Sequence, residues 1–187
     1  RFFGVGPWAR LQDRAATLHA SLRSLIEARR ATPGDDVLSL LLAARDEEGR
    51  GLDDGALIEQ LVTFVVAGHE TTATTLAWAM YELHRHPTAL AKLRAELAAA
   101  ADQPPEALAR LPLLAATCSE TLRRHAPVPI VPRKLLRDVT VRGFPLAAGG
   151  VVAAAIHLAH HDPATFPEPH EFRPERFVGR TFTPFEF

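Results

Sequence analysis

The stretch that decides the fold is Ala67-Gly68-His69-Glu70-Thr71-Thr72, inside a helical pattern that spans residues 54–86. An apolar run leads into it, so a carboxylate and two hydroxyls follow a segment typical of a protein interior. Glycine and threonine are poor helix formers, and a buried ionisable group is costly unless it has a partner. One interpretation is a proton-delivery site beside a gap in the helix that admits a ligand or cofactor. The other is an ordinary N-cap, with Thr71 or Thr72 starting a new helix after Gly68.

Helical periodicity continues on both sides of this segment. Apolar residues recur at helical spacing, and proline or glycine marks where each helix stops. Asp35 or Asp36 is expected to cap a short second helix, and Asp53 the long central one. The first predicted helix begins near residue 11 and ends before Pro33-Gly34, and the others cover residues 37–45, 54–86, 88–101 and 113–125.

The character of the chain changes at Pro127. Closely spaced prolines impose extended backbone there, and β-type stretches follow at residues 133–136, 139–142 and 151–156. Beyond Asp162-Pro163 the pattern is that of a proline-spaced coil. The sequence therefore predicts a mainly α fold with a small β portion, and its 187 residues suggest one domain.

Composition narrows the class of protein. An apolar content of 47% with 23% charged residues is that of a globular protein, and a net charge of −1 gives no basic field for nucleic acid. The single cysteine excludes an internal disulfide framework. No leader or membrane-spanning run is recognisable, so a cytoplasmic location is expected. The chain opens on Arg1 without a methionine, which leaves an upstream anchor open, and we expect both ends to be cut from a longer protein.

Two further motifs join the central stretch. Glu120-Thr121-Leu122-Arg123 places a carboxylate and a guanidinium on one helix face, and Phe172-Arg173-Pro174-Glu175-Arg176-Phe177 follows later. Each is weak alone, because such pairs are usually solvated. The order A-G-x-E-T-T, E-x-x-R, small sheet and F-x-P-E-R-F resembles the cytochrome P450 family of haem-thiolate monooxygenases, over about residues 52–187.

The resemblance implies a partial cytochrome P450 fold, with a long central helix, an E-x-x-R helix, a small sheet and a meander. Ala67 and Gly68 match the small pair that leaves room for dioxygen, and Glu70 and Thr71 match the acid–alcohol pair that delivers protons while the O–O bond breaks.

The same resemblance assigns structural and cofactor-binding roles. Glu120, Arg123 and Arg176 match a buried salt-bridge cluster that holds the meander beneath the haem, and Arg133 matches a basic residue that binds a haem propionate. For Arg133, an ordinary strand arginine is nearly as good an interpretation.

The family's axial cysteine has no match in this chain. That cysteine lies in a glycine-rich loop after the P-E-R-F motif, so we expect it beyond Phe187. Cys118 lies inside a predicted helix without a neighbouring glycine, and its expected role is that of a buried small apolar residue. His69-Glu70 lacks the second histidine of an H-E-x-x-H zinc helix, because Ala73 stands there. We therefore expect no metal ligands in this chain.

The expected parent is an enzyme that uses haem b, O2 and electrons from a ferredoxin or a flavodoxin/reductase. It would hydroxylate or epoxidise a small hydrophobic substrate, since residues 64–68 and 128–131, which match parts of the pocket wall, are apolar. This fragment alone is expected to be inactive. The alternative is a non-catalytic helical interaction module derived from the same fold.

Overall fold

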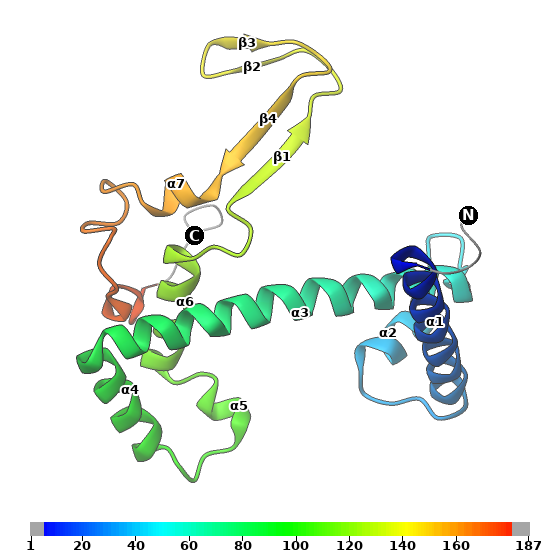
Figure 1. Ribbon diagram of the computed structural model, residues 1–187, viewed down its shortest axis with the longest axis horizontal. Helices are drawn as coiled ribbons and strands as arrows, with labels where there is room; N and C mark the ends of the chain where they lie inside the picture. The colour runs from blue at the N-terminus through cyan, green and yellow to red at the C-terminus, as the bar shows by residue number, and fades with distance from the viewer. Residues whose placement is uncertain (1–5, 181–187) are drawn as a thin grey trace. The chain divides into compact units, whose positions relative to one another are not determined.

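The computed structural model describes residues 6–180, which form two compact units. The boundary lies between Glu70 and Thr71, inside the long helix α3 (Asp54–Arg85) (Figure 1). Each unit has its own buried residues and is described by itself.

The first unit consists of three helical segments around one apolar cluster. They are α1 (Pro7–Ala31), α2 (Val37–Ala43) and the first part of α3. Leu22 and Ile26, which are four residues apart on one face of α1, lie in the same cluster as Leu38 of α2 and Leu57 and Ile58 of α3.

Aspartate caps fix the starts of α2 and α3. Asp36 Oδ1 accepts a hydrogen bond from the backbone N–H of Ser39 at 2.9 Å, and Asp53 Oδ1 accepts one from Ala56 at 2.8 Å. Both bonds satisfy N–H groups that have no partner inside their helix. The predicted caps are confirmed, with Asp36 rather than Asp35 at the second helix.

The second unit begins with the rest of α3 and three further helices. These are α4 (Pro87–Ala99), α5 (Pro105–Leu108) and α6 (Pro112–Arg124). Leu83 of α3 and Leu93 of α4 are buried with Phe172. Glu96 of α4 caps α6 from outside, because its two carboxylate oxygens accept the backbone N–H groups of Leu113 and Leu114 at 2.8 and 2.9 Å.

Two antiparallel strand pairs follow α6. β1 (Ile130–Lys134) pairs with β4 (Val151–Ala155), and β2 (Val139–Val141) pairs with β3 (Phe144–Leu146). The turn between β2 and β3 consists of Arg142 and Gly143, which both have positive φ angles. Two such residues are typical of a tight hairpin turn that matches the twist of the strands.

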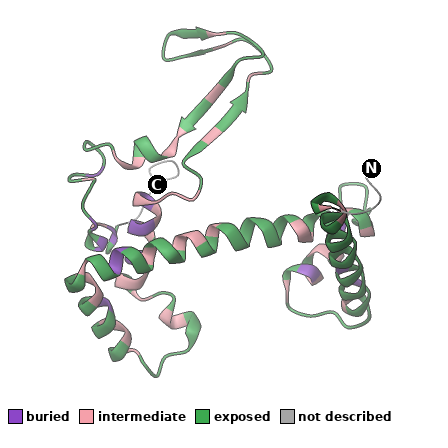
Figure 2. Ribbon diagram, viewed as in Figure 1, coloured by how far each residue is buried: buried purple, intermediate pink, exposed green. Residues whose placement is uncertain are grey.

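The end of the second unit packs against α6 (Figure 2). α7 (Ile156–His160) follows β4 directly, and a 3₁₀ turn, η1 (Pro174–Phe177), closes the described chain. Phe166 and Phe177 are buried with Ala116 of α6. Irregular backbone between α7 and η1 therefore contributes to the core.

The predicted fold class, mainly α with a small β portion, is confirmed. Four short elements were not predicted: α5, β3, α7 and η1. Pro105 and Pro174 stand in the first turn of two of them. At that position the missing N–H of proline costs nothing, so both prolines begin short helical turns where the sequence predicts no regular structure.

Much of α3 is exposed, including apolar side chains such as Phe64, Val65 and Val66 in the first unit and Leu76 in the second (Figure 2). Among the described residues, none of the helices combines the length and the apolar character that a membrane span requires.

Candidate functional site

The central stretch does not start a new helix. α3 is helical from Asp54 to Arg85 without interruption, so the N-cap interpretation of Thr71 or Thr72 is wrong. The helix tolerates these threonines partly because their hydroxyls can bond one turn back, as Thr75 Oγ1 does by donating to the carbonyl oxygen of Thr71 at 2.7 Å. Apart from its chain neighbours and the backbone of its own helix, a Cβ at Gly68 would meet no atom of the described chain within 4 Å, so this glycine faces open space.

Glu70 and Thr71 differ in their surroundings. Glu70 is exposed, as are Ala67 and Gly68, whereas Thr71 is half-buried. Consecutive residues of an α-helix point about 100° apart, so the carboxylate and the hydroxyl do not share a face.

Thr71 lies at an apolar hollow between α3 and α6. The hollow has a volume of about 400 Å³, and Cys118 and Leu122 of α6 form part of its wall. Cys118 is exposed there, so the expectation that it is a buried residue is wrong. The remaining lining residues are Thr71, Thr72, Thr75, Leu76, Ala79 and Pro127.

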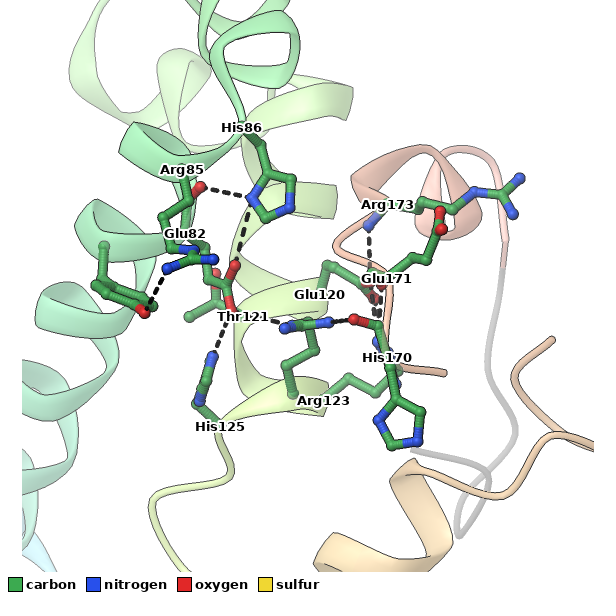
Figure 3. Close-up of polar contacts among 12 residues, drawn as sticks. Glu82, Arg85, His86, Glu120, Thr121, Arg123, His125, His170, Glu171 and Arg173 are labelled. Carbon is green, nitrogen blue, oxygen red and sulfur yellow. Dashed lines mark hydrogen bonds and ion pairs between the residues drawn. The ribbon is translucent and has the colours of Figure 1, made fainter. Parts of the chain in front are cut away.

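Glu120, Arg123 and Arg176 are brought together on the other side of α6 from Cys118. Arg123 Nε donates to Glu120 Oε2 at 2.7 Å and Arg123 Nη2 to Oε1 at 3.0 Å, with both side chains fully buried. Arg176 Nε lies 3.1 Å from Glu120 Oε2. One carboxylate thus binds two guanidinium groups, and Figure 3 labels Glu120 and Arg123 of this cluster.

The remaining donors of this cluster bind backbone. Arg123 Nη1 donates to the carbonyl oxygen of His160 at 2.7 Å, and Arg176 Nη1 to that of Pro167 at 2.9 Å. Glu120 also accepts the backbone N–H of Arg173 at 2.9 Å. The cluster therefore fixes the irregular segment between α7 and η1, which matches the meander of the expected fold.

A second buried carboxylate, Glu82 of α3, was not singled out from the sequence. His125 Nε2 lies 2.6 Å from its Oε1, and His86 Nδ1 lies 3.3 Å from its Oε2 (Figure 3). Arg124 Nε lies 3.0 Å from the same Oε1. Trp78 stacks on the His125 ring, with centroids 4.0 Å apart. The i, i+4 spacing of Glu82 and His86 on one helix was the signal available in the sequence.

Two opposing effects set the pKa of Glu82. Burial raises it, but the hydrogen bond from His125 and the charge and hydrogen bond of Arg124 outweigh burial, so the pKa lies below its ordinary value. Glu82 is therefore an anion at neutral pH and joins α3 to the end of α6.

Arg133 lies apart from these clusters. It is exposed on β1 opposite Val152, and its Nη1 donates to the carbonyl oxygen of Pro132 at 2.9 Å. Within residues 6–180 its guanidinium forms no ion pair. It is therefore available to an anionic group.

Comparisons with known proteins agree in one family. The cytochrome P450 family model matches residues 2–185. The chain is 42% identical over 182 residues to the "Putative cytochrome P450 135B1" of Mycobacterium tuberculosis, which covers 95% of this chain and 38% of that protein. It is 37% identical over 180 residues to the cyclooctat-9-en-7-ol 5-monooxygenase of Streptomyces melanosporofaciens, covering 92% and 39%.

A solved structure gives the same result. Retinoic acid-bound cyanobacterial CYP120A1 superposes with a TM-score of 0.81 at 31% identity, covering 100% of this chain and 45% of that one. The chain therefore spans less than half the length of these relatives.

Replacing Arg123 with alanine should prevent folding of the full-length protein. Removing one member of a buried charged cluster leaves Glu120 incompletely paired, at a cost of about 3–5 kcal/mol. This is a large part of a typical stability of about 5–15 kcal/mol. We expect little soluble, haem-loaded protein from Arg123→Ala and a normal yield from Arg94→Ala, which removes an exposed arginine of α4. A normal yield of holoprotein from Arg123→Ala would contradict a structural role for the cluster.

Replacing Glu82 with glutamine should lower stability in a pH-dependent way. A carboxylate whose pKa is lowered by folding contributes stability above its unfolded pKa, near 4.5, and loses it as the pH falls through the folded value. In the full-length protein we expect the free energy of unfolding, measured with urea, to fall by about 1.5–3 kcal/mol at pH 7, and this loss to shrink below pH 4.5. Glu59→Gln, on an exposed face of the same helix, is the control. A loss that is independent of pH would contradict the ionised state of Glu82.

Proposed function

The chain belongs to the cytochrome P450 family, and we propose that it is the part of a haem-dependent monooxygenase that contains the proton-delivery helix and the meander. The observation that carries this proposal is the apolar hollow between α3 and α6, which Thr71 lines. On this proposal residues 1–187 form part of a single cytochrome P450 domain that also includes chain outside them.

The residues of the second unit fit a haem b group. Haem, when bound, supplies the iron that activates dioxygen. Leu76, Ala79 and Leu122 offer an apolar wall to a flat hydrophobic macrocycle, and Arg133 has donors for a propionate because it has no ion pair among residues 6–180.

Thr71 and Glu70 would deliver protons beside that wall. Thr71 lines the hollow, where its hydroxyl would supply a proton, and the exposed Glu70 carboxylate would take up protons from solvent. A bridging water links them, because the two side chains point in different directions on an unbroken helix. Ala67 and Gly68 leave space for dioxygen, in keeping with the open surroundings of Gly68.

Cys118 is a poor source for an axial thiolate. It lies within α6, and although the residue is exposed, partial burial of its thiol raises the pKa of that thiol and disfavours the thiolate. We therefore assign the axial ligand to a cysteine outside this chain, and residues 1–187 alone to an inactive fragment.

The substrate would be a small hydrophobic molecule that is hydroxylated or epoxidised. One relative is named for cyclooctat-9-en-7-ol and one solved relative contains retinoic acid, both organic molecules with a mainly hydrocarbon skeleton. Electrons would come from a ferredoxin or a flavodoxin/reductase, as the family resemblance implies. The proposed location is the cytoplasm.

Replacing Thr71 with alanine should uncouple turnover in the full-length enzyme. Loss of the hydroxyl removes a positioned proton donor, which is typically worth about 10²–10⁴-fold in rate. We expect normal haem content, a fall in product formed per NAD(P)H consumed, and more hydrogen peroxide. Thr71→Ser should restore coupling, and Thr63→Ala, at an exposed position of the same helix, should not disturb it. Unchanged coupling in Thr71→Ala would remove Thr71 from the mechanism.

Residues 1–187 expressed alone should show no monooxygenase activity. The exposed apolar side chains of α3 each forfeit about 1.5–3 kcal/mol of burial, and no thiolate is positioned to bind iron. We expect aggregation or a molten globule, and a ferrous–CO spectrum without the long-wavelength Soret band of thiolate-ligated haem. A monodisperse chain with that band would assign the axial ligand to Cys118 instead. A folded full-length protein that never retains haem would favour the non-catalytic module.

A further inference from the structure

A second hollow lies entirely within the first unit and is surrounded by arginines. It has a volume of about 450 Å³ and lies between the end of α1, α2 and the loop that precedes α3. Arg29 and Arg30 come from α1, and Arg45 follows α2. The other lining residues are Pro33, Ser39, Leu42, Ala43, Gly51 and Leu52.

The charges around this hollow do not balance. Arg29 pairs with Asp36 and Arg30 with Asp54, each at 2.6 Å. Neither aspartate is among the lining residues of the hollow, and within the described part of this unit Arg45 forms no ion pair. Three guanidinium groups therefore line the hollow, and no carboxylate is among its lining residues.

Arg45 is nevertheless held in place. Its Nη1 donates to the carbonyl oxygens of Leu42 at 2.9 Å and Ala44 at 2.6 Å, at the C-terminal end of α2. These bonds use one nitrogen of the guanidinium. Among residues 6–180 the other donors of this planar group have no hydrogen-bond partner, so they can bind a ligand.

Two glycines let these arginines lie close to the backbone. A Cβ on Gly34 would be 2.6 Å from Arg29 Nη1, and a Cβ on Gly51 would be 3.1 Å from Arg45 Nη1. Arg29 Nε is buried without a hydrogen-bond partner among the described residues. A buried donor of this kind calls for an acceptor that is not part of the chain, such as a water or an anion.

We propose that this hollow binds the oxyanion group of a small organic anion, a phosphate or a carboxylate. Arginine recognises both groups through paired N–H donors. The volume exceeds that of a bare ion and lies in the range of small-molecule sites, and Pro33, Leu42 and Leu52 offer an apolar surface to the rest of the ligand. The proposal does not depend on the proposed monooxygenase activity.

The test is calorimetric titration of the full-length, haem-loaded protein with butyl phosphate, butyrate and inorganic phosphate, against sodium chloride at the same ionic strength. We expect saturable binding of at least one organic oxyanion and none of chloride. Arg45→Gln should weaken that binding about tenfold or more, because a charge-assisted hydrogen bond is lost. Arg14→Gln, which removes an exposed arginine of α1 outside the hollow, should leave it unchanged.

Leu52→Glu provides a second test that leaves every arginine in place. A carboxylate on the wall should abolish anion binding, whereas the neutral control Leu52→Gln should retain it. Comparison of butyl phosphate with butyrate identifies the preferred oxyanion. Equal binding of chloride, equal effects of Arg45→Gln and Arg14→Gln, or no saturable binding below about 10 mM would each overturn the proposal.

Discussion

The second unit depends on the buried carboxylate of Glu120. It accepts bonds from Arg123, Arg176 and the backbone of Arg173, and so joins segments that lie more than 50 residues apart in sequence. Burying these charges is costly, and the cost is offset only when nearly every donor finds an acceptor. The guanidinium groups meet this condition by binding carbonyl oxygens of the segment between α7 and η1. That segment has little regular structure, so polar contacts as well as apolar packing define its path.

Glu82 has the corresponding role where the end of α6 meets α3, because it binds Arg124 and His125. Arg123 belongs to the Glu120 cluster and the next residue, Arg124, to the Glu82 cluster. The end of α6 is therefore fixed to α3 on one face and to the meander on the other. The apolar hollow lies between the same two helices, so the separation of its walls is set by ion pairs that do not line it. Because these ion pairs position the helices from outside the hollow, its lining remains available for apolar contacts with a ligand.

The sequence predicted the features that depend on local periodicity and on spacing within one helix. The helices, the aspartate caps and the partners Glu120 and Arg123 follow from such short-range patterns. It did not predict the Glu82 cluster, because Arg124 and His125 are more than 40 residues away and only folding brings them together. Cys118 was misplaced for a related reason: a small apolar residue suggests burial, but its helix face borders the hollow. The short helical turns α5 and η1 were not predicted, because a proline can either stop a helix or stand in its first turn.

The adjacency of Arg123 and Arg124 makes the last turn of α6 intolerant of a change in length. Each added or deleted residue rotates everything after it by about 100° around the helix axis. A single insertion between Glu120 and Arg123 would therefore turn Arg123 away from Glu120 and Arg124 away from Glu82 at the same time. The two clusters thus fix both the length and the rotational setting of this helix, whereas the loops on either side of it carry neither cluster.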